Sequence, residues 1–158
     1  MKIIFQKPSQ ALNKAYFKQN LKKEDVELFQ KNLLRMFDRL DKSESEENHK
    51  SLIADFLKDT FYKDRHEINT RDRKDLVIHR GKTNREPVGV IIEAKKEKSP
   101  EMISENRPNA KALHELLLYY FDEREKQNIE ISHLIITDLH NWFVFDENCF
   151  CFLYCRSN

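Results

Sequence analysis

The sequence predicts a mixed α/β domain in which a central mixed β-sheet is flanked by helices and preceded by an N-terminal helical pair. Apolar residues at helical spacing dominate the first third of the chain, runs typical of strands follow, and one more helical segment separates these from a last group of strands. A chain of 158 residues is most economically one domain with one core. We expect an N-terminal arm at residues 1–19 and a single domain at residues 20–158.

Two helices are predicted before the strands. From Lys23 to Leu40, apolar residues recur three and four positions apart. A polar, acidic break at residues 41–48 follows, with Ser43 and Glu46 spaced as in a capping box. The second helix then has its inner stripe at Leu52, Ile53, Phe56, Leu57 and Phe61.

The strands and the last helix follow in the order β-β-β-α-β-β. Residues 88–94 are apolar at both alternating sets of positions, as in a strand that is covered on both faces. A charged loop at residues 96–108 leads to a helix at residues 110–126. Strands are expected at residues 67–70, 75–79, 88–95, 133–138 and 141–146, and residues 148–154 close the chain.

Composition excludes several classes of protein. Apolar residues make up 39% of the chain and charged residues 35%, and no run approaches the length of a membrane span. Two glycines and no G-x-x-x-x-G-K-[ST] motif argue against a glycine-rich phosphate loop, and no methyltransferase motif is present. Cys149, Cys151 and Cys155 lack zinc-knuckle spacing, and their odd number without a secretory signal fits a reducing cytoplasm.

The charge is distributed unevenly although the net charge is only +1. Between Lys63 and Arg85 there are eight basic and four acidic residues, and Lys95, Lys96 and Lys98 follow soon after. A local positive face is what contact with nucleic-acid phosphates requires. A solvated loop and strand edge is an equally good explanation.

Asp75, Glu93 and Lys95 form the strongest candidate site. A hairpin closed symmetrically through residues 80–87 brings the two strands into register and aligns both acids, because directly opposed residues have Cβ atoms about 4.5–5.5 Å apart. Alternation puts Lys95 on the same face as Glu93. The expected pairs are His79 with Gly89, Val77 with Ile91, and Asp75 with Glu93.

Two carboxylates this close must take up a proton or share a cation. Mg²⁺ is a suitable cation for the two acids to share, since it binds through one or two carboxylates and keeps water and phosphate oxygens as its other ligands. Lys95 would then orient the attacking water or place its charge beside the phosphate. The alternative is an ordinary salt bridge between strand ends.

At these residues the chain resembles the PD-(D/E)XK nuclease superfamily: Asp75 matches the first acid, and Glu93 and Lys95 match the E-x-K half. Lys74 stands where the motif often has proline. The resemblance extends over most of residues 20–150, in stretches that are similar to the N-terminal nuclease region of type IIG restriction-modification enzymes. Those stretches are residues 68–79, 87–95, 111–116, 133–137 and 142–146.

This resemblance implies a restriction-endonuclease-like fold and a type II site-specific deoxyribonuclease that hydrolyses duplex DNA. It implies Mg²⁺ (or Mn²⁺) held by Asp75, Glu93 and the backbone carbonyl of Ala94. It also implies methyltransferase and target-recognition domains in the same longer chain, a bacterial cytoplasmic location away from membranes, and dimerisation as an open option. The residues expected along the DNA are Arg71, Arg73, Lys74 and Lys96.

Further candidates lie on the helices. Glu47 matches an additional acid that many of these nucleases carry before the first strand, with Asp55 as its rival; first-turn acids also complement the helix dipole. Lys111 and His114 are one turn apart on the last helix. His114 is expected to contact phosphate or water, or to be an ordinary surface histidine.

Two other functions compete with a restriction nuclease. One is a DNA-binding or scaffold domain that has the nuclease fold but no turnover. The other is a repair or resolvase-type nuclease of the same fold. Intact Asp75, Glu93 and Lys95 favour catalysis over the scaffold.

Overall fold

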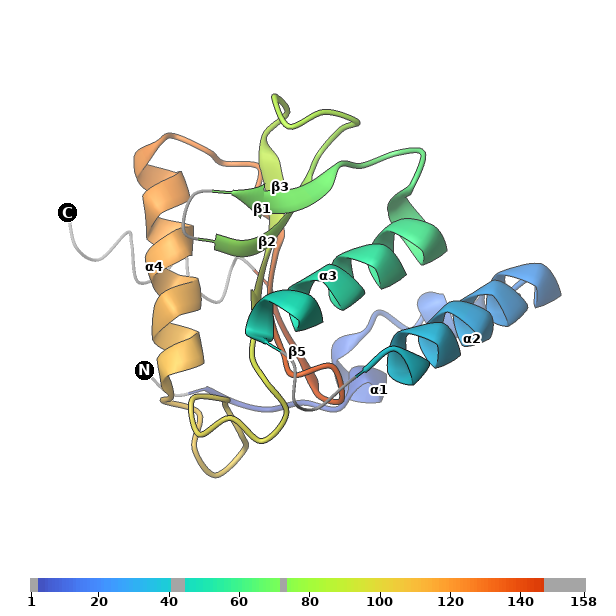
Figure 1. Ribbon diagram of the computed structural model, residues 1–158, viewed down its shortest axis with the longest axis horizontal. Helices are drawn as coiled ribbons and strands as arrows, with labels where there is room; N and C mark the ends of the chain where they lie inside the picture. Colours follow the sequence, from blue (N-terminus) through green and yellow to red (C-terminus); the bar gives the residue numbers. More distant parts are fainter. Residues whose placement is uncertain (1–2, 41–44, 72–73, 147–158) are drawn as a thin grey trace.

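The centre of the computed structural model is a five-stranded sheet in the order β1-β2-β3-β4-β5. The structure describes residues 3–40, 45–71 and 74–146 (Figure 1). Only the β3–β4 pair is parallel in this sheet, so the predicted mixed sheet with flanking helices is confirmed. The closing segment at residues 148–154 and the three cysteines, Cys149, Cys151 and Cys155, lie outside the described residues. The strands are β1 Ile68–Arg71, β2 Lys74–His79, β3 Val88–Ala94, β4 His133–Thr137 and β5 Trp142–Asp146.

Three helices agree with the periodic segments of the sequence: α2 Lys23–Asp38, α3 Glu46–Leu57 and α4 Lys111–Glu125. A short helix, α1 Pro8–Ala11, lies in the N-terminal arm, where the sequence has no clear helical period. The cap of α3 is Ser45, whose side chain accepts a hydrogen bond from the Asn48 backbone N–H at 3.3 Å. Ser43, which was predicted to cap this helix, lies outside the described residues. After Leu57 the chain continues in a π-helical turn at Lys58–Tyr62.

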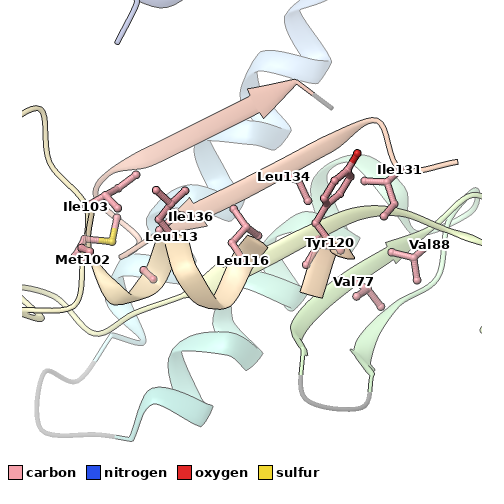
Figure 2. Packing of buried hydrophobic residues seen from close by; sticks show 13 residues of the cluster. Val77, Val88, Met102, Ile103, Leu113, Leu116, Tyr120, Ile131, Leu134 and Ile136 are labelled. Atoms are coloured by element: carbon pink, nitrogen blue, oxygen red, sulfur yellow. The ribbon is translucent and has the colours of Figure 1, made fainter. Parts of the chain in front are cut away.

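Helices cover both faces of the sheet. Figure 1 shows α4 on one side and the α2–α3 pair on the other. On the α4 side, Tyr120 and Leu116 are fully buried against β4 residues such as Leu134 (Figure 2). On the other side, α3 residues such as Ile53 pack on β2 and β3. The β3 strand contributes to both cores, as its doubly apolar sequence predicts.

The β2–β3 register decides where the site residues lie. Val77 pairs with Ile91, as predicted, and Leu76 pairs with Ile92. The predicted pairing of His79 with Gly89 is wrong, because a bulge after Ile78 places His79 opposite Val88. The bulge lies beyond Ile78, at the end of the hairpin away from the acids, and leaves their alignment unchanged.

His79 is a satisfied strand histidine. It is 1% exposed, with Nδ1 2.7 Å from the Glu86 carbonyl oxygen and Nε2 3.2 Å from the Asn69 side-chain oxygen. These contacts tie the end of the hairpin to β1.

The N-terminal arm returns to the sheet. Ile3 packs against the α4-side core, and the Phe5 ring lies 5.6 Å from that of Phe143 on β5. Within the described residues, none of the helices has the length and apolar character needed to cross a membrane.

Candidate active site

The candidate site lies at the edge of the sheet where β2 begins and β3 ends. Since Leu76 pairs with Ile92, the same register continued by one residue places Asp75 beside Glu93. Lys95 follows immediately after β3 and donates its backbone N–H to the Thr137 carbonyl at 2.8 Å. Asp75, Glu93 and Lys95 are all buried, at 7%, 1% and 4% exposure. The structure therefore brings the three predicted residues together.

Asp75 is fixed through both of its oxygens. Oδ2 accepts the Ala94 backbone N–H at 2.9 Å, which ties the side chain to β3. Oδ1 lies 2.8 Å from Nζ of Lys50, a residue of α3. Burial lowers the pKa of Lys50, but its contacts with Asp75 and Glu47 outweigh that effect and raise the pKa to about 12. Lys50 is therefore positively charged, and its ammonium lies beside the Asp75 carboxylate.

Lys95 joins β3 to α4. Its Nζ lies 2.7 Å from Oε1 of Glu93 and 2.7 Å from Oε2 of Glu115, with Glu101 farther away at 3.5 Å. Burial works to lower the pKa of Lys95, yet the hydrogen bonds that Lys95 donates to Glu115 and Glu93 outweigh burial and raise it. The ammonium is charged and held in one position by two carboxylates.

Glu93 is a buried acid with a second acid, Asp75, beside it. Its burial, and next the charge of Asp75, raise the pKa of Glu93 to about 8, although Lys95 opposes the shift. Its Oε2 is buried and has no hydrogen-bond partner among the described residues. A buried carboxylate oxygen without a donor is unfavourable unless a proton or a cation satisfies it.

A second ring of charges surrounds Lys95 on the α4 side. Lys111 Nζ lies 2.9 Å from Glu101 and 3.4 Å from Glu115. Burial raises the pKa of Glu115, but the contacts with Lys95 and Lys111 prevail and lower it. The hydrogen bond from Lys111 lowers the pKa of Glu101. Lys111, predicted as an additional site residue, thus lies in this outer ring.

Glu47 reaches the site only through Lys50. Its carboxylate lies 3.1 Å from Lys50 Nζ, and its side chain is 70% exposed. The rival acid Asp55 points to α2, where it accepts a hydrogen bond from Arg39 at 2.8 Å. Of the two acids considered on this helix, Glu47 is therefore the one next to the cluster.

Two other predicted residues, His114 and Lys96, lie outside the cluster. His114 is exposed and its Nε2 is 2.6 Å from the Asn109 side-chain oxygen. Lys96 is exposed directly after Lys95. Arg71 ends β1 and Lys74 begins β2, at the same edge as Asp75, while Arg73 lies outside the described residues.

Lys50, Glu115 and Tyr119 are site residues that sequence reasoning missed. Burial, and then the charges of Glu93 and Asp75, raise the pKa of Tyr119 to about 12, which places its phenol in the field of the site. Helical spacing relates them only to the predicted helix residues: Lys50 is three residues after Glu47, and Glu115 and Tyr119 follow Lys111 at intervals of four. It does not show that they lie near Asp75 and Glu93.

The donors fit Mg²⁺ in one specific way. Within residues 3–40, 45–71 and 74–146, no three His, Cys, Asp or Glu side chains are arranged to hold a metal by themselves. Mg²⁺ does not need such a cage, because one or two carboxylates suffice when water and substrate supply the rest. Asp75 and Glu93, whose Oε2 is unsatisfied among the described residues, could supply those two carboxylates, and the Ala94 carbonyl directly follows Glu93 in the sequence.

A family model described as a domain of unknown function, DUF7149, matches residues 6–158. Neither the comparison with curated proteins nor the comparison with solved structures gave a match. The match spans all of the elements that build the site.

Proposed function

The chain belongs to the DUF7149 family, and we propose that it is a Mg²⁺-dependent endonuclease domain that hydrolyses phosphodiester bonds of duplex DNA. One observation carries the proposal: a buried carboxylate oxygen of Glu93 has no donor in the described part of the chain, and it lies beside a second buried acid, Asp75, and a buried lysine, Lys95. A divalent cation satisfies that oxygen and removes the repulsion between the acids.

Asp75, Glu93 and the Ala94 carbonyl would hold the ion. The ion, when bound, acidifies a water molecule and stabilises charge on phosphate oxygens. The chain itself orients the lysine: Glu93 and Glu115 hold Lys95 Nζ at 2.7 Å each, so its charge is fixed relative to the acids. A preorganised charge of this kind stabilises charge that develops during reaction without further rearrangement.

The finer assignment is a restriction-endonuclease-like fold within a restriction-modification protein. Support comes from the placement of the acids on the antiparallel β2–β3 pair and from the α4 crossover that leads into the parallel strand β4. In this proposal, methyltransferase and target-recognition domains belong to the same longer chain. DNA would run along the edge where β1 ends and β2 begins, near Arg71, Lys74 and Lys96.

The test is nicking of supercoiled plasmid by purified protein with Mg²⁺, with Mn²⁺ and with chelator. We expect Asp75→Asn and Lys95→Ala to lower the rate by roughly 10²-fold or more, the scale typical of groups that act in proton transfer or electrostatic stabilisation. Lys126→Ala is the control, because Lys126 pairs with Asp122 on an exposed part of α4.

Circular dichroism should confirm that each variant folds. Nicking that continues in chelator would contradict a metal-dependent mechanism. Nicking that survives Lys95→Ala unchanged would remove Lys95 from the mechanism, and a branched DNA junction cut in preference to plasmid would favour the repair or resolvase alternative.

A catalytically silent DNA-binding domain is the second candidate. The observation in its favour is that Lys50 and Lys95 already neutralise much of the acidic charge, with Lys50 on Asp75 and Lys95 on Glu93 and Glu115. This candidate predicts DNA binding without cleavage, and equal binding by wild type and Asp75→Asn.

A further inference from the structure

Lys50 occupies a position between two sets of acids. Its Nζ lies 2.8 Å from Oδ1 of Asp75 on one side, and 3.1 Å from Glu47 and 3.8 Å from Glu46 on the other. The lysine side chain is only 14% exposed, whereas Glu47 is 70% exposed and Glu46 is 38% exposed. One ammonium thus links a buried acid to two acids at the surface.

Asp75 offers only one oxygen away from the backbone. Oδ2 accepts the Ala94 N–H and holds the side chain on β3, so Oδ1 is the oxygen that Lys50 and a bound cation would share. Two positive charges close to one carboxylate oxygen repel each other strongly where water is scarce. Lysine has a flexible stem and no fixed geometry of hydrogen bonding, so its ammonium can move where a guanidinium fork would resist.

We propose that Lys50 is a displaceable counter-ion of Asp75: a divalent cation takes its place, and the ammonium moves onto Glu47 and Glu46. This inference rests on the proposed function, because it assumes that the cation binds at Asp75. It gives Glu47 a role different from that of a metal ligand. Glu47 receives the displaced lysine and makes its departure from Asp75 less costly.

The first experiment measures Mg²⁺ affinity by isothermal titration calorimetry, without DNA and without turnover. We expect Lys50→Gln to tighten Mg²⁺ binding about tenfold, because the ion no longer competes with an ammonium. Lys50→Met is the second variant, because the glutamine amide of Lys50→Gln could form a new hydrogen bond whereas the methionine side chain could not. Lys23→Gln is the matched control: this exposed lysine of α2 contacts Glu27 rather than Asp75, so the Mg²⁺ affinity of the variant should stay within about twofold of wild type.

The second experiment is a double-mutant cycle between Lys50 and Glu47. Glu47→Gln should weaken Mg²⁺ binding several-fold in the wild-type background, because the displaced ammonium loses an acceptor. In the Lys50→Gln background the same change should have almost no effect. A metal ligand would behave differently: Glu47→Gln would weaken binding equally in both backgrounds, and that result would overturn the inference.

The outcomes separate this inference from the proposed function. One outcome would overturn the exchange and leave the metal site intact. In that outcome Mg²⁺ binds wild type, Lys50→Gln and Lys50→Met with equal affinity, and Mg²⁺ binding is lost in Asp75→Asn. A chain that binds no Mg²⁺ in any background would overturn both. Thermal unfolding without Mg²⁺ provides the check on folding, and Lys50→Gln should unfold at a lower temperature because Asp75 loses its counter-ion.

Discussion

The buried carboxyl of Glu93 makes stability depend on pH. Burial and the charge of Asp75 raise the pKa of Glu93 to about 8, from an ordinary value near 4.5. Between these values the folded protein holds a proton that the unfolded chain has released. The free energy of unfolding therefore falls as pH rises through this window, by at most about 1.4 kcal/mol per pH unit from this group.

We expect the free energy of unfolding of Glu93→Gln to depend less on pH in this window, because the glutamine amide stays neutral at every pH. Urea unfolding at several values between about pH 5 and about pH 8 measures the two slopes. Glu101 and Glu115 do not interfere, since lowered pKa values make their contribution decline only as pH falls below the ordinary range. Parallel slopes for wild type and variant would show that Glu93 does not titrate in this window.

His49 is a buried polar side chain without a hydrogen-bond partner among the described residues. It is 1% exposed on α3, and neither ring nitrogen has a hydrogen-bond partner among the described residues. Because an unsatisfied buried polar group costs about 1–3 kcal/mol, we expect His49→Leu to raise the free energy of unfolding by roughly 1 kcal/mol.

Chemical denaturation measures the effect of His49→Leu. The control is His133→Leu, the same chemical change at an exposed position of β4, which should change stability by less than about 0.5 kcal/mol. A less stable His49→Leu protein would mean that the ring is satisfied by solvent or by residues outside the described parts.

Single residues also show what a sequence can reveal about a site. Asp75, Glu93 and Lys95 could be found because strand alternation places them at one end of a hairpin, and the structure does bring them together. Lys50 and Glu115 could not be paired with them from the sequence alone. Their contacts depend on how α3 and α4 are placed against the sheet, which no local pattern encodes.

At the scale of elements, the start of α3 positions Lys50. Ser45 caps this helix through the Asn48 N–H, and loss of such a cap costs about 1 kcal/mol. We expect Ser45→Ala to lower the free energy of unfolding by about that amount in urea denaturation. Ser51→Ala is the control within the same helix, where alanine is the better helix former and the change should be near zero.

Equal effects of Ser45→Ala and Ser51→Ala would show that the serine at the helix start does not act as a cap. The comparison is informative because both serines are exposed, so packing changes little in either variant. What differs between them is the backbone group that each hydroxyl contacts.

The long periodic elements were predicted closely, and the irregular ones were not. The helix expected from Lys23 to Leu40 spans Lys23–Asp38, and the strand expected at residues 88–95 spans Val88–Ala94. Each of these elements has many apolar residues in a regular pattern, so the pattern determines both the type of element and the side chains that are buried. The bulge at His79 depends instead on contacts with Asn69 and Glu86, which lie on other segments, so local periodicity did not show it.

At the scale of the whole molecule, the order of strands decides which ends meet. Parallel pairing of β3 with β4 requires a crossover, and α4 supplies it on one face while α2 and α3 cover the other (Figure 1). The mixed sheet with flanking helices could be expected from the succession of elements. The positions of the helices over the sheet edge, which complete the charged cluster, follow from packing of the two cores.

The cluster draws on three parts of the chain: α3, the β2–β3 hairpin and α4. During synthesis, Lys95 emerges before Glu115, so one of the two carboxylates that hold the lysine is missing until α4 has been made. Under the proposed function, a ribosome-bound or truncated product that ends before α4 would be harmless to the genome, since its cutting machinery has yet to be assembled.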